Sequence, residues 1–178
     1  MRNKELFRGG RKAGRIVGLV LTLALAVSLL SGCGQSKERL TFGTGGTAGT
    51  YYSYGGVLAQ YITNNTNVKV TAVSTGGSKA NLQSVQDGDF QLGFVQSDVM
   101  AYAWDGVRAF EQDGATHDFR TLGGLYAETV QLFTMDPDIK TVEDLKGKSV
   151  SIGAANSGVY FNALDVLNAG GITLDDIH

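Results

Sequence analysis

The sequence has 178 residues, the length of one domain of ordinary size, and a formal net charge of −2. Residues 1–32 hold six of the fifteen Lys and Arg residues but one of the seventeen Asp and Glu residues, so the remainder carries a net charge of −7. This acidic balance excludes a basic surface for nucleic acid, and the single cysteine excludes an internal disulfide.

The N-terminus has the pattern of a secretory signal. Residues 1–15 are basic, and residues 16–30 are uncharged and almost wholly apolar, but too short for the roughly 20 residues of a membrane span. We therefore expect residues 1–32 to be a signal peptide. The run "LSGC" that ends at Cys33 resembles the lipobox of bacterial lipoproteins, in which this thiol is acylated. The resemblance predicts a lipid anchor such as palmitate at Cys33, on the outer face of a membrane toward periplasm or medium. The alternative is an ordinary cleavage site beside an incidental cysteine.

The rest of the chain alternates between strand-like and helix-like patterns. Strands are expected over residues 39–44, 68–74, 90–96, 119–126, 129–135 and 149–154. Helical segments are expected over residues 50–66, 76–89 (a glycine-broken turn and a short helix), 97–110, 141–148 and 157–171. Strands that alternate with helices in steps of 20 to 30 residues predict an α/β fold with a parallel sheet and right-handed crossovers.

Two helices have predicted buried faces. In the helix over residues 50–66, Tyr54, Val57, Leu58 and Tyr61 fall on one face at helical spacing. Trp104 and Phe110 fall on the apolar stripe of the helix over residues 97–110, which predicts that they belong to the core.

Four strand-to-helix junctions are rich in glycine or hydroxyl groups, and ligands of parallel sheets gather beyond the carboxyl ends of the strands. These junctions are residues 43–52, 74–81, 96–98 and 154–161. Each would place backbone N–H groups at a helix N-terminus, a ready site for an anionic or strongly polar group. Hydroxyl donors are expected from Thr44, Thr47, Thr50, Ser53, Ser74, Thr75 and Ser78. The alternative is that the threonines cap helices and the glycines only make turns.

The glycines do not fit a nucleotide site. A P-loop needs lysine directly after them, whereas Gly49 is followed by Thr50 and the next lysine is Lys69. A dinucleotide fold needs an acidic residue for the ribose, and none occurs between Glu38 and Asp87. We therefore expect no cofactor and no metal.

Four stretches of the sequence together resemble the TAXI family of solute-binding proteins from TRAP transporters, from about Leu40 to the end of the chain. These are "LTFGTGGTAGTYYSYGG", "VSTGGSKANLQSVQDGDFQLGFVQSDV", "FRTLGGLY" and "TVEDLKGKSVSIGAANSG". The resemblance implies a type II periplasmic-binding-protein fold with two lobes and parallel-rich sheets. It also implies capture of a small carboxylated solute, often proposed to be glutamate, glutamine or a related acid, for a membrane permease driven by an ion gradient.

The resemblance also implies which residues bind the solute. The first lobe would contribute Thr44, Gly49, Thr50, Tyr51, Thr75, Gly76, Gly77, Ser78, Asn81, Gln96 and Ser97, and the second Ser157 and Gly158. The lobes would be residues 33–137 and 138–178, divided at Pro137. Because family members are nearly twice as long, the second lobe is expected to be incomplete.

Two other functions stay open at this point. One is a surface lipoprotein or adhesin whose pocket is vestigial. The other is an enzyme on the same bilobal fold, which would need a general base or nucleophile at a junction. None of the four junctions holds a His, Cys or Glu, so the sequence favours binding without catalysis.

Overall fold

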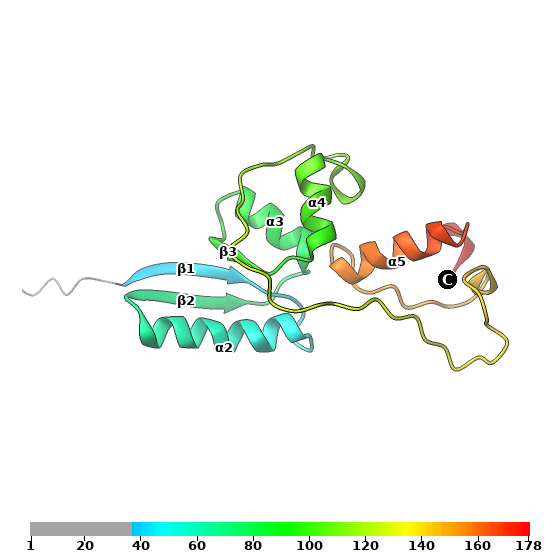
Figure 1. Ribbon diagram of the computed structural model, residues 1–178, viewed down its shortest axis with the longest axis horizontal. Helices are drawn as coiled ribbons and strands as arrows, with labels where there is room; N and C mark the ends of the chain where they lie inside the picture. Colours follow the sequence, from blue (N-terminus) through cyan, green and yellow to red (C-terminus); the bar gives the residue numbers. More distant parts are fainter. Residues whose placement is uncertain (1–36) are drawn as a thin grey trace, which may run out of the picture. The chain divides into compact units, whose positions relative to one another are not determined.

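A parallel sheet of three strands lies in the N-terminal half of the described chain (Figure 1). Its strands are β1 (Glu38–Gly43), β2 (Val68–Val73) and β3 (Leu92–Gly93), in the order β2-β1-β3. β1 and β2 run in step from Glu38 opposite Val68 to Gly43 opposite Val73. The computed structural model describes residues 37–178, so the predicted signal peptide and Cys33 lie outside the described residues.

Helices alternate with these strands, as the sequence predicts. In chain order they are α2 (Thr50–Asn65), α3 (Ser78–Gln86), α4 (Ser97–Asp105) and α5 (Gly158–Ala169). Three 3-10 turns are η1 (Arg108–Phe110), η2 (Glu143–Leu145) and η3 (Leu174–Asp176). Crossover helices between parallel strands confirm the α/β fold. No helix within residues 37–178 combines the length and apolar character needed to span a bilayer.

Successive residues of β1 point to opposite faces of the sheet and so contact different helices. Phe42 packs against Ala59 of α2 and against Phe94, whose ring centre is 4.6 Å from that of Phe42. The next residue, Gly43, faces α3, where a Cβ atom would lie 2.5 Å from Oδ1 of Asn81. α2 therefore covers one face of the sheet and α3 the other (Figure 1).

The buried face of α2 differs from the predicted one. Tyr54, Val57 and Tyr61 are exposed, whereas Gly55 and Ala59 are buried against the sheet. The glycine allows the helix to approach the sheet closely. Of the four predicted residues, Leu58 packs against this core, where Tyr51 and Ile62 join it.

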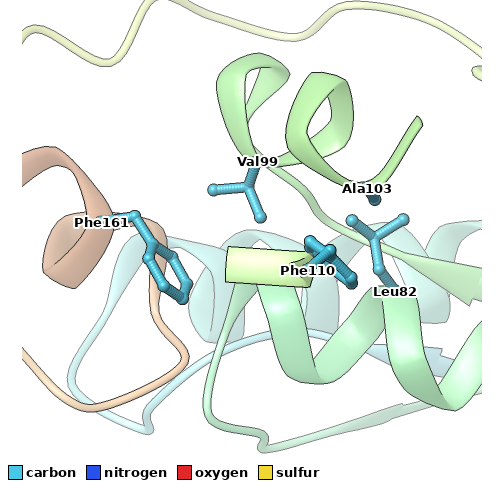
Figure 2. Packing of buried hydrophobic residues seen from close by; sticks show 5 residues of the cluster. All are labelled: Leu82, Val99, Ala103, Phe110 and Phe161. Atoms are coloured by element: carbon cyan, nitrogen blue, oxygen red, sulfur yellow. The ribbon is translucent and has the colours of Figure 1, made fainter. Parts of the chain in front are cut away.

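A second core joins α3, α4, η1 and α5. Leu82, Val99, Ala103 and Phe110 pack together with Phe161 of α5 (Figure 2). The prediction for Phe110 is confirmed, because its side chain is fully buried. The prediction for Trp104 is wrong. It is 47% exposed, because it leaves this core and packs against His117 instead.

Two elements are shorter than the sequence patterns predict. β3 has two residues because it meets only Phe42 and Gly43 at the end of β1. α4 ends at Asp105 because Gly106 adopts a left-handed conformation, with φ of 65°, and directs the chain into η1.

The strands predicted over residues 119–126, 129–135 and 149–154 do not form in the described chain. Residues 119–135 continue without regular structure, and no ladder joins them to β1, β2 or β3. Around residue 150 two backbone bonds link the chain to His178, from Val150 N to His178 O and from His178 N to Lys148 O. A β-strand forms only when a neighbouring strand is available for hydrogen bonding, and the β propensity of these three segments does not provide such a neighbour.

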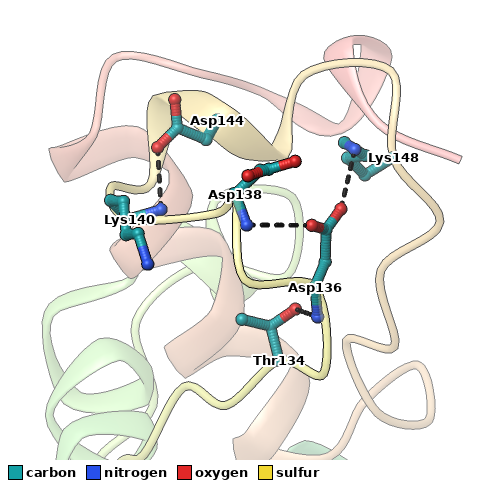
Figure 3. A network of polar contacts seen from close by, with 6 residues as sticks. All are labelled: Thr134, Asp136, Asp138, Lys140, Asp144 and Lys148. Carbon is teal, nitrogen blue, oxygen red and sulfur yellow. Dashed lines mark hydrogen bonds and ion pairs between the residues drawn. The ribbon is translucent and has the colours of Figure 1, made fainter.

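Polar contacts organise the chain between residues 134 and 148 (Figure 3). The carboxylate of Asp136 accepts hydrogen bonds from the backbone of Asp138 and from Nζ of Lys148, each at 3.0 Å. These two contacts hold the pKa of Asp136 below its ordinary value. Asp144 accepts from the backbone N–H groups of Lys140 and Thr141 and so fixes the entry to η2, the predicted helical turn.

Residues Glu38–His178 form one compact unit. A division of this unit at Pro137 into two lobes stays a prediction.

Candidate functional site

A cavity of about 610 Å³ opens where the predicted junctions meet. Backbone and side chains from the β1–α2, β2–α3 and β3–α4 junctions form part of its wall, together with the first turn of α5. The convergence of these four segments, which are up to about 110 residues apart in the sequence, is the arrangement that the junction pattern predicts.

Ten of the thirteen predicted site residues line this cavity. They are Gly49, Thr50, Tyr51, Thr75, Gly76, Gly77, Ser78, Gln96, Ser157 and Gly158. Their role in binding stays a prediction, but their positions around one hollow are as expected.

Thr44 and Asn81 are fully buried and do not line this cavity, so their role in binding stays a prediction that their positions do not support. Oγ1 of Thr44 donates to Val73 O at 2.5 Å. Nδ2 of Asn81 donates to Thr44 O at 2.7 Å and to Phe94 O at 2.8 Å, and its Oδ1 accepts from Thr75 Oγ1 at 2.7 Å. These side chains join the ends of the strands beneath the cavity, because buried polar groups must be hydrogen-bonded.

Ser97 is exposed at the start of α4 and also lies outside the cavity wall. The helix begins there, and only its N-cap residue, Gln96, reaches the wall.

Glycine N-caps leave two helices open toward the cavity. Gly49 precedes α2 and Gly77 precedes α3, and neither helix has a side-chain cap. The first N–H groups of a helix have no partner within the helix, so those of α2 are available to a ligand. α3 is only partly open, because Lys79 N in its first turn donates to Asn156 O at 3.0 Å. Gly77 has φ of +106°, a conformation that favours glycine. α5 differs, because the hydroxyl of its N-cap Ser157 accepts from Tyr160 N at 3.1 Å.

Several wall hydroxyls are already engaged within the protein. Thr75 Oγ1 donates to Asn81 and accepts from Gly77 N at 3.1 Å, and Ser78 Oγ accepts from Gln96 N at 3.1 Å. Thr50 is different: its side chain is exposed, and its hydroxyl has no hydrogen-bond partner within residues 37–178. The hydroxyls of Thr75, Ser78 and Ser157 therefore serve the fold, and among the described α-helices only α5 has a side-chain cap, from Ser157 and not from a threonine.

An acidic residue that the sequence did not suggest, Glu128, lines the cavity together with Tyr126. Tyr51 Oη donates to Glu128 Oε2 at 3.3 Å. Burial, followed by the negative charge of Glu128, raises the pKa of Tyr51. The same causes, in the same order, raise the pKa of Tyr126. Both phenols therefore stay neutral hydrogen-bond donors at physiological pH. The only signal in the sequence for a role of Glu128 was its position between the strands predicted over residues 119–126 and 129–135.

Arg108 and Arg120 do not line the cavity. Arg108 pairs with Asp165 at 3.4 Å, and Arg120 donates to the backbone of His117 and Phe119. Asp165 also accepts from Tyr102 Oη, and this hydrogen bond is the main cause that raises the pKa of Tyr102 to about 12. These contacts fasten α5 to α4 and η1.

A chain of amides connects the cavity wall to α4. Gln96 Nε2 donates to Asn162 Oδ1 at 3.2 Å, and Asn162 Nδ2 donates to Asp98 Oδ2 at 2.5 Å. Because the carboxylate of Asp98 can only accept, it sets the orientation of Asn162 and in turn that of Gln96. Oε1 of Gln96 is then buried without a hydrogen-bond partner in the described chain and lies against Gly158.

We expect Gly158→Ala to break this amide chain, because the added Cβ would overlap Gln96 Oε1. Overpacking of this kind costs about 1 to 3 kcal/mol, measurable as a lower urea midpoint. The double variant Gly158→Ala/Gln96→Ala removes the overlap, so its cost should be smaller than the sum of the two single costs. Additive costs would show that the side chain of Gln96 is not the reason why alanine is unfavourable at position 158.

Much of the remaining wall is apolar, which the sequence patterns did not indicate, although Thr129, Gln131 and Ser151 also line it. The apolar part is formed by Val130, Leu132, Leu145, Val150, Ile152, Val159, Ala163, Val166 and Leu167. Of these, Leu145 and Leu167 belong to a small core with Ile172 and Ile177. A cavity with an apolar wall and a few convergent polar groups is the usual form of a small-molecule site.

The comparison with known families agrees with this geometry. Residues 42–178 match the NMT1-like family, and the match includes every residue of the cavity wall. Members of this family are periplasmic solute-binding proteins and are typically extracytoplasmic. The chain therefore belongs to the NMT1-like family of solute-binding proteins.

Proposed function

We propose that this protein is an extracytoplasmic receptor of the TAXI type that captures a small carboxylated solute and delivers it to a TRAP-type permease. One observation carries the proposal: the open N-terminus of α2, the partly open N-terminus of α3 and the wall residue Thr50 meet at one cavity of about 610 Å³. A carboxylate fits this rim because backbone N–H groups at helix N-termini bind anions. Amino acids such as glutamate and glutamine, and organic acids, are the solutes proposed.

The proposal includes a lipid anchor at Cys33. The sequence "LSGC" supports it, and the anchor would hold the receptor at the membrane that contains its permease. Metabolic labelling with a palmitate analogue tests this part, with Cys33→Ser as the control that should take up no label.

We propose that the cavity binds its solute without transforming it. Among the described wall residues, Glu128 is the one carboxylate, and no His, Cys or Lys lies beside it to complete a nucleophile–base pair. Turnover of a chromogenic ester by the purified protein would contradict this and favour an enzyme on the same fold.

Thermal-shift screening against amino, dicarboxylic and 2-oxo acids tests the proposed function. A receptor is stabilised by its ligand according to ligand concentration and affinity, so a saturable rise in melting temperature is expected with at least one acid. No response to any solute would instead favour the surface lipoprotein with a vestigial pocket.

We expect Thr50→Val to weaken solute binding about fivefold with little change in stability. The variant removes a hydroxyl that faces the cavity and has no partner in the described chain, and a hydrogen bond of this kind contributes roughly 1 kcal/mol. Isothermal titration calorimetry measures the affinity and a thermal melt the stability. Thr47→Val is the matched control, since Thr47 is exposed in the same loop but does not line the cavity. Equal affinity of the Thr50 variant and the wild type would remove Thr50 from the site.

A further inference from the structure

Glu128 is a charged group on the cavity wall that no protein cation neutralises. It is the one Asp, Glu, Lys, Arg or His among the wall residues that the structure describes. The described ion pairs join Lys79 to Asp113, Arg108 to Asp165 and Lys148 to Asp136, so Glu128 has no ion-pair partner within residues 37–178.

The position of Glu128 conflicts with a ligand that carries only negative charge. Its carboxylate lies 3.3 Å from the phenol of Tyr51, a residue in the first turn of α2. The open N–H groups of that turn favour an anion, whereas Glu128 repels one. A ligand with both charges fits this arrangement: its anionic group binds the N–H groups of α2, and its cationic group lies beside Glu128.

We infer that the solute is an acid that also carries a protonated amine, and that Glu128 binds this amine and determines the specificity of the cavity. The inference rests on the proposed function, because it names the class of solute that the receptor takes. The proposed function names amino acids and organic acids together as candidate solutes, and the inference selects the amino acids.

Two phenols prepare Glu128 for this role. Tyr51 donates a hydrogen bond to one carboxylate oxygen, and Tyr126 lies close enough for the charge of Glu128 to affect its titration. The hydrogen bond orients the carboxylate but leaves its charge in place, so a cation bound there gains an electrostatic contact, which solvent partly screens because Glu128 is exposed.

Pairs of acids that differ in the amine test the inference. Suitable pairs are L-glutamate with 2-oxoglutarate, L-leucine with 4-methyl-2-oxopentanoate, and 4-aminobutanoate with butanoate. By titration calorimetry on the protein, we expect the amine-bearing member of the best pair to bind about ten- to hundredfold more tightly. In Glu128→Gln this preference should largely disappear, while the affinity for the amine-free member stays equal or rises.

Glu143→Gln is the matched control, because Glu143 is an exposed acid of η2 outside the cavity wall, and it should keep the wild-type preference. Equal binding of both members by the wild type would overturn the inference but leave the solute-binding function standing. A preference that survives in Glu128→Gln would overturn the role of Glu128. Failure of all these acids to bind would overturn the proposed function, and the inference with it.

Discussion

Asn81→Ala should lower the free energy of unfolding by about 3 to 5 kcal/mol. The amide of Asn81 is fully buried and makes hydrogen bonds to Thr44 O, Phe94 O and Thr75 Oγ1. Truncation leaves these groups without that partner, and each buried polar group left unsatisfied costs about 1 to 3 kcal/mol. Urea unfolding followed by circular dichroism measures the change as a shift in midpoint at constant slope.

The space around Asn81 leaves few substitutes. Ideal Cβ atoms on Gly43 and Gly93 would lie 2.5 Å and 3.1 Å from its side-chain atoms, so the two glycines fit closely around it. Asn81→Asp keeps the size but turns an oxygen toward two carbonyls, and it should also destabilise the fold. Gln86→Ala removes an exposed amide from the same helix and should change stability by less than about 0.5 kcal/mol. An Asn81→Ala variant of wild-type stability but weak solute affinity would return Asn81 to the binding site.

Neighbouring glycines of α2 should respond to alanine with opposite signs. A Cβ at Gly55 would lie 2.5 Å from Thr44 Cγ2 and 3.2 Å from Phe94 Cε2. Thr44 cannot move aside, because it is fully buried and bonded to Val73 O. We expect Gly55→Ala to cost about 1 to 3 kcal/mol. Gly56 is exposed, with no atom within 4 Å of its Cβ position, so Gly56→Ala should stabilise the helix by about 0.5 to 1 kcal/mol.

The Gly55 variant should also weaken solute binding. Phe94 contacts the ring of Tyr51 with centres 5.1 Å apart, so a shift of α2 at Gly55 moves Tyr51 at the cavity wall. Thermal melts of the two single variants and titration of both with the same acid provide the comparison. If both alanines stabilise the protein, close packing of α2 against Thr44 and Phe94 does not require glycine at position 55.

Local patterns in the sequence predicted the α/β class, the helical segments and three of the six expected strands. The signals for β1, β2, α3 and α5 are local. Each is a repeat of apolar residues, or a glycine at a helix start, within the element itself, so these elements were predicted with nearly correct ends. The strands expected between residues 119 and 154 failed because a strand depends on a partner that local sequence does not specify. The buried face of α2 failed for a related reason, since the identity of its neighbour decided which side chains were covered.

The sequence predicted where the candidate site lies better than it predicted which side chains line it. The junctions were expected to converge because parallel strands end at one edge, and ten of thirteen residues followed. Whether a polar side chain serves the ligand or the fold depends on its partners in space, which is why Thr44 and Asn81 were expected in the cavity wall but do not line it. Glu128 was missed because it lies in a segment whose path no local pattern describes.

The first turns of α3 and α5 lie against each other. Lys79 N donates to Asn156 O at 3.0 Å, and a Cβ on Gly77 would be 3.1 Å from Ser157 Cα. Each helix carries a positive dipole end of about half a unit charge there, so the two ends repel. Under the proposed function, an anionic solute bound beside both ends would act as a shared counterion. We therefore expect capture of the solute and attachment of α5 to α3 to favour each other.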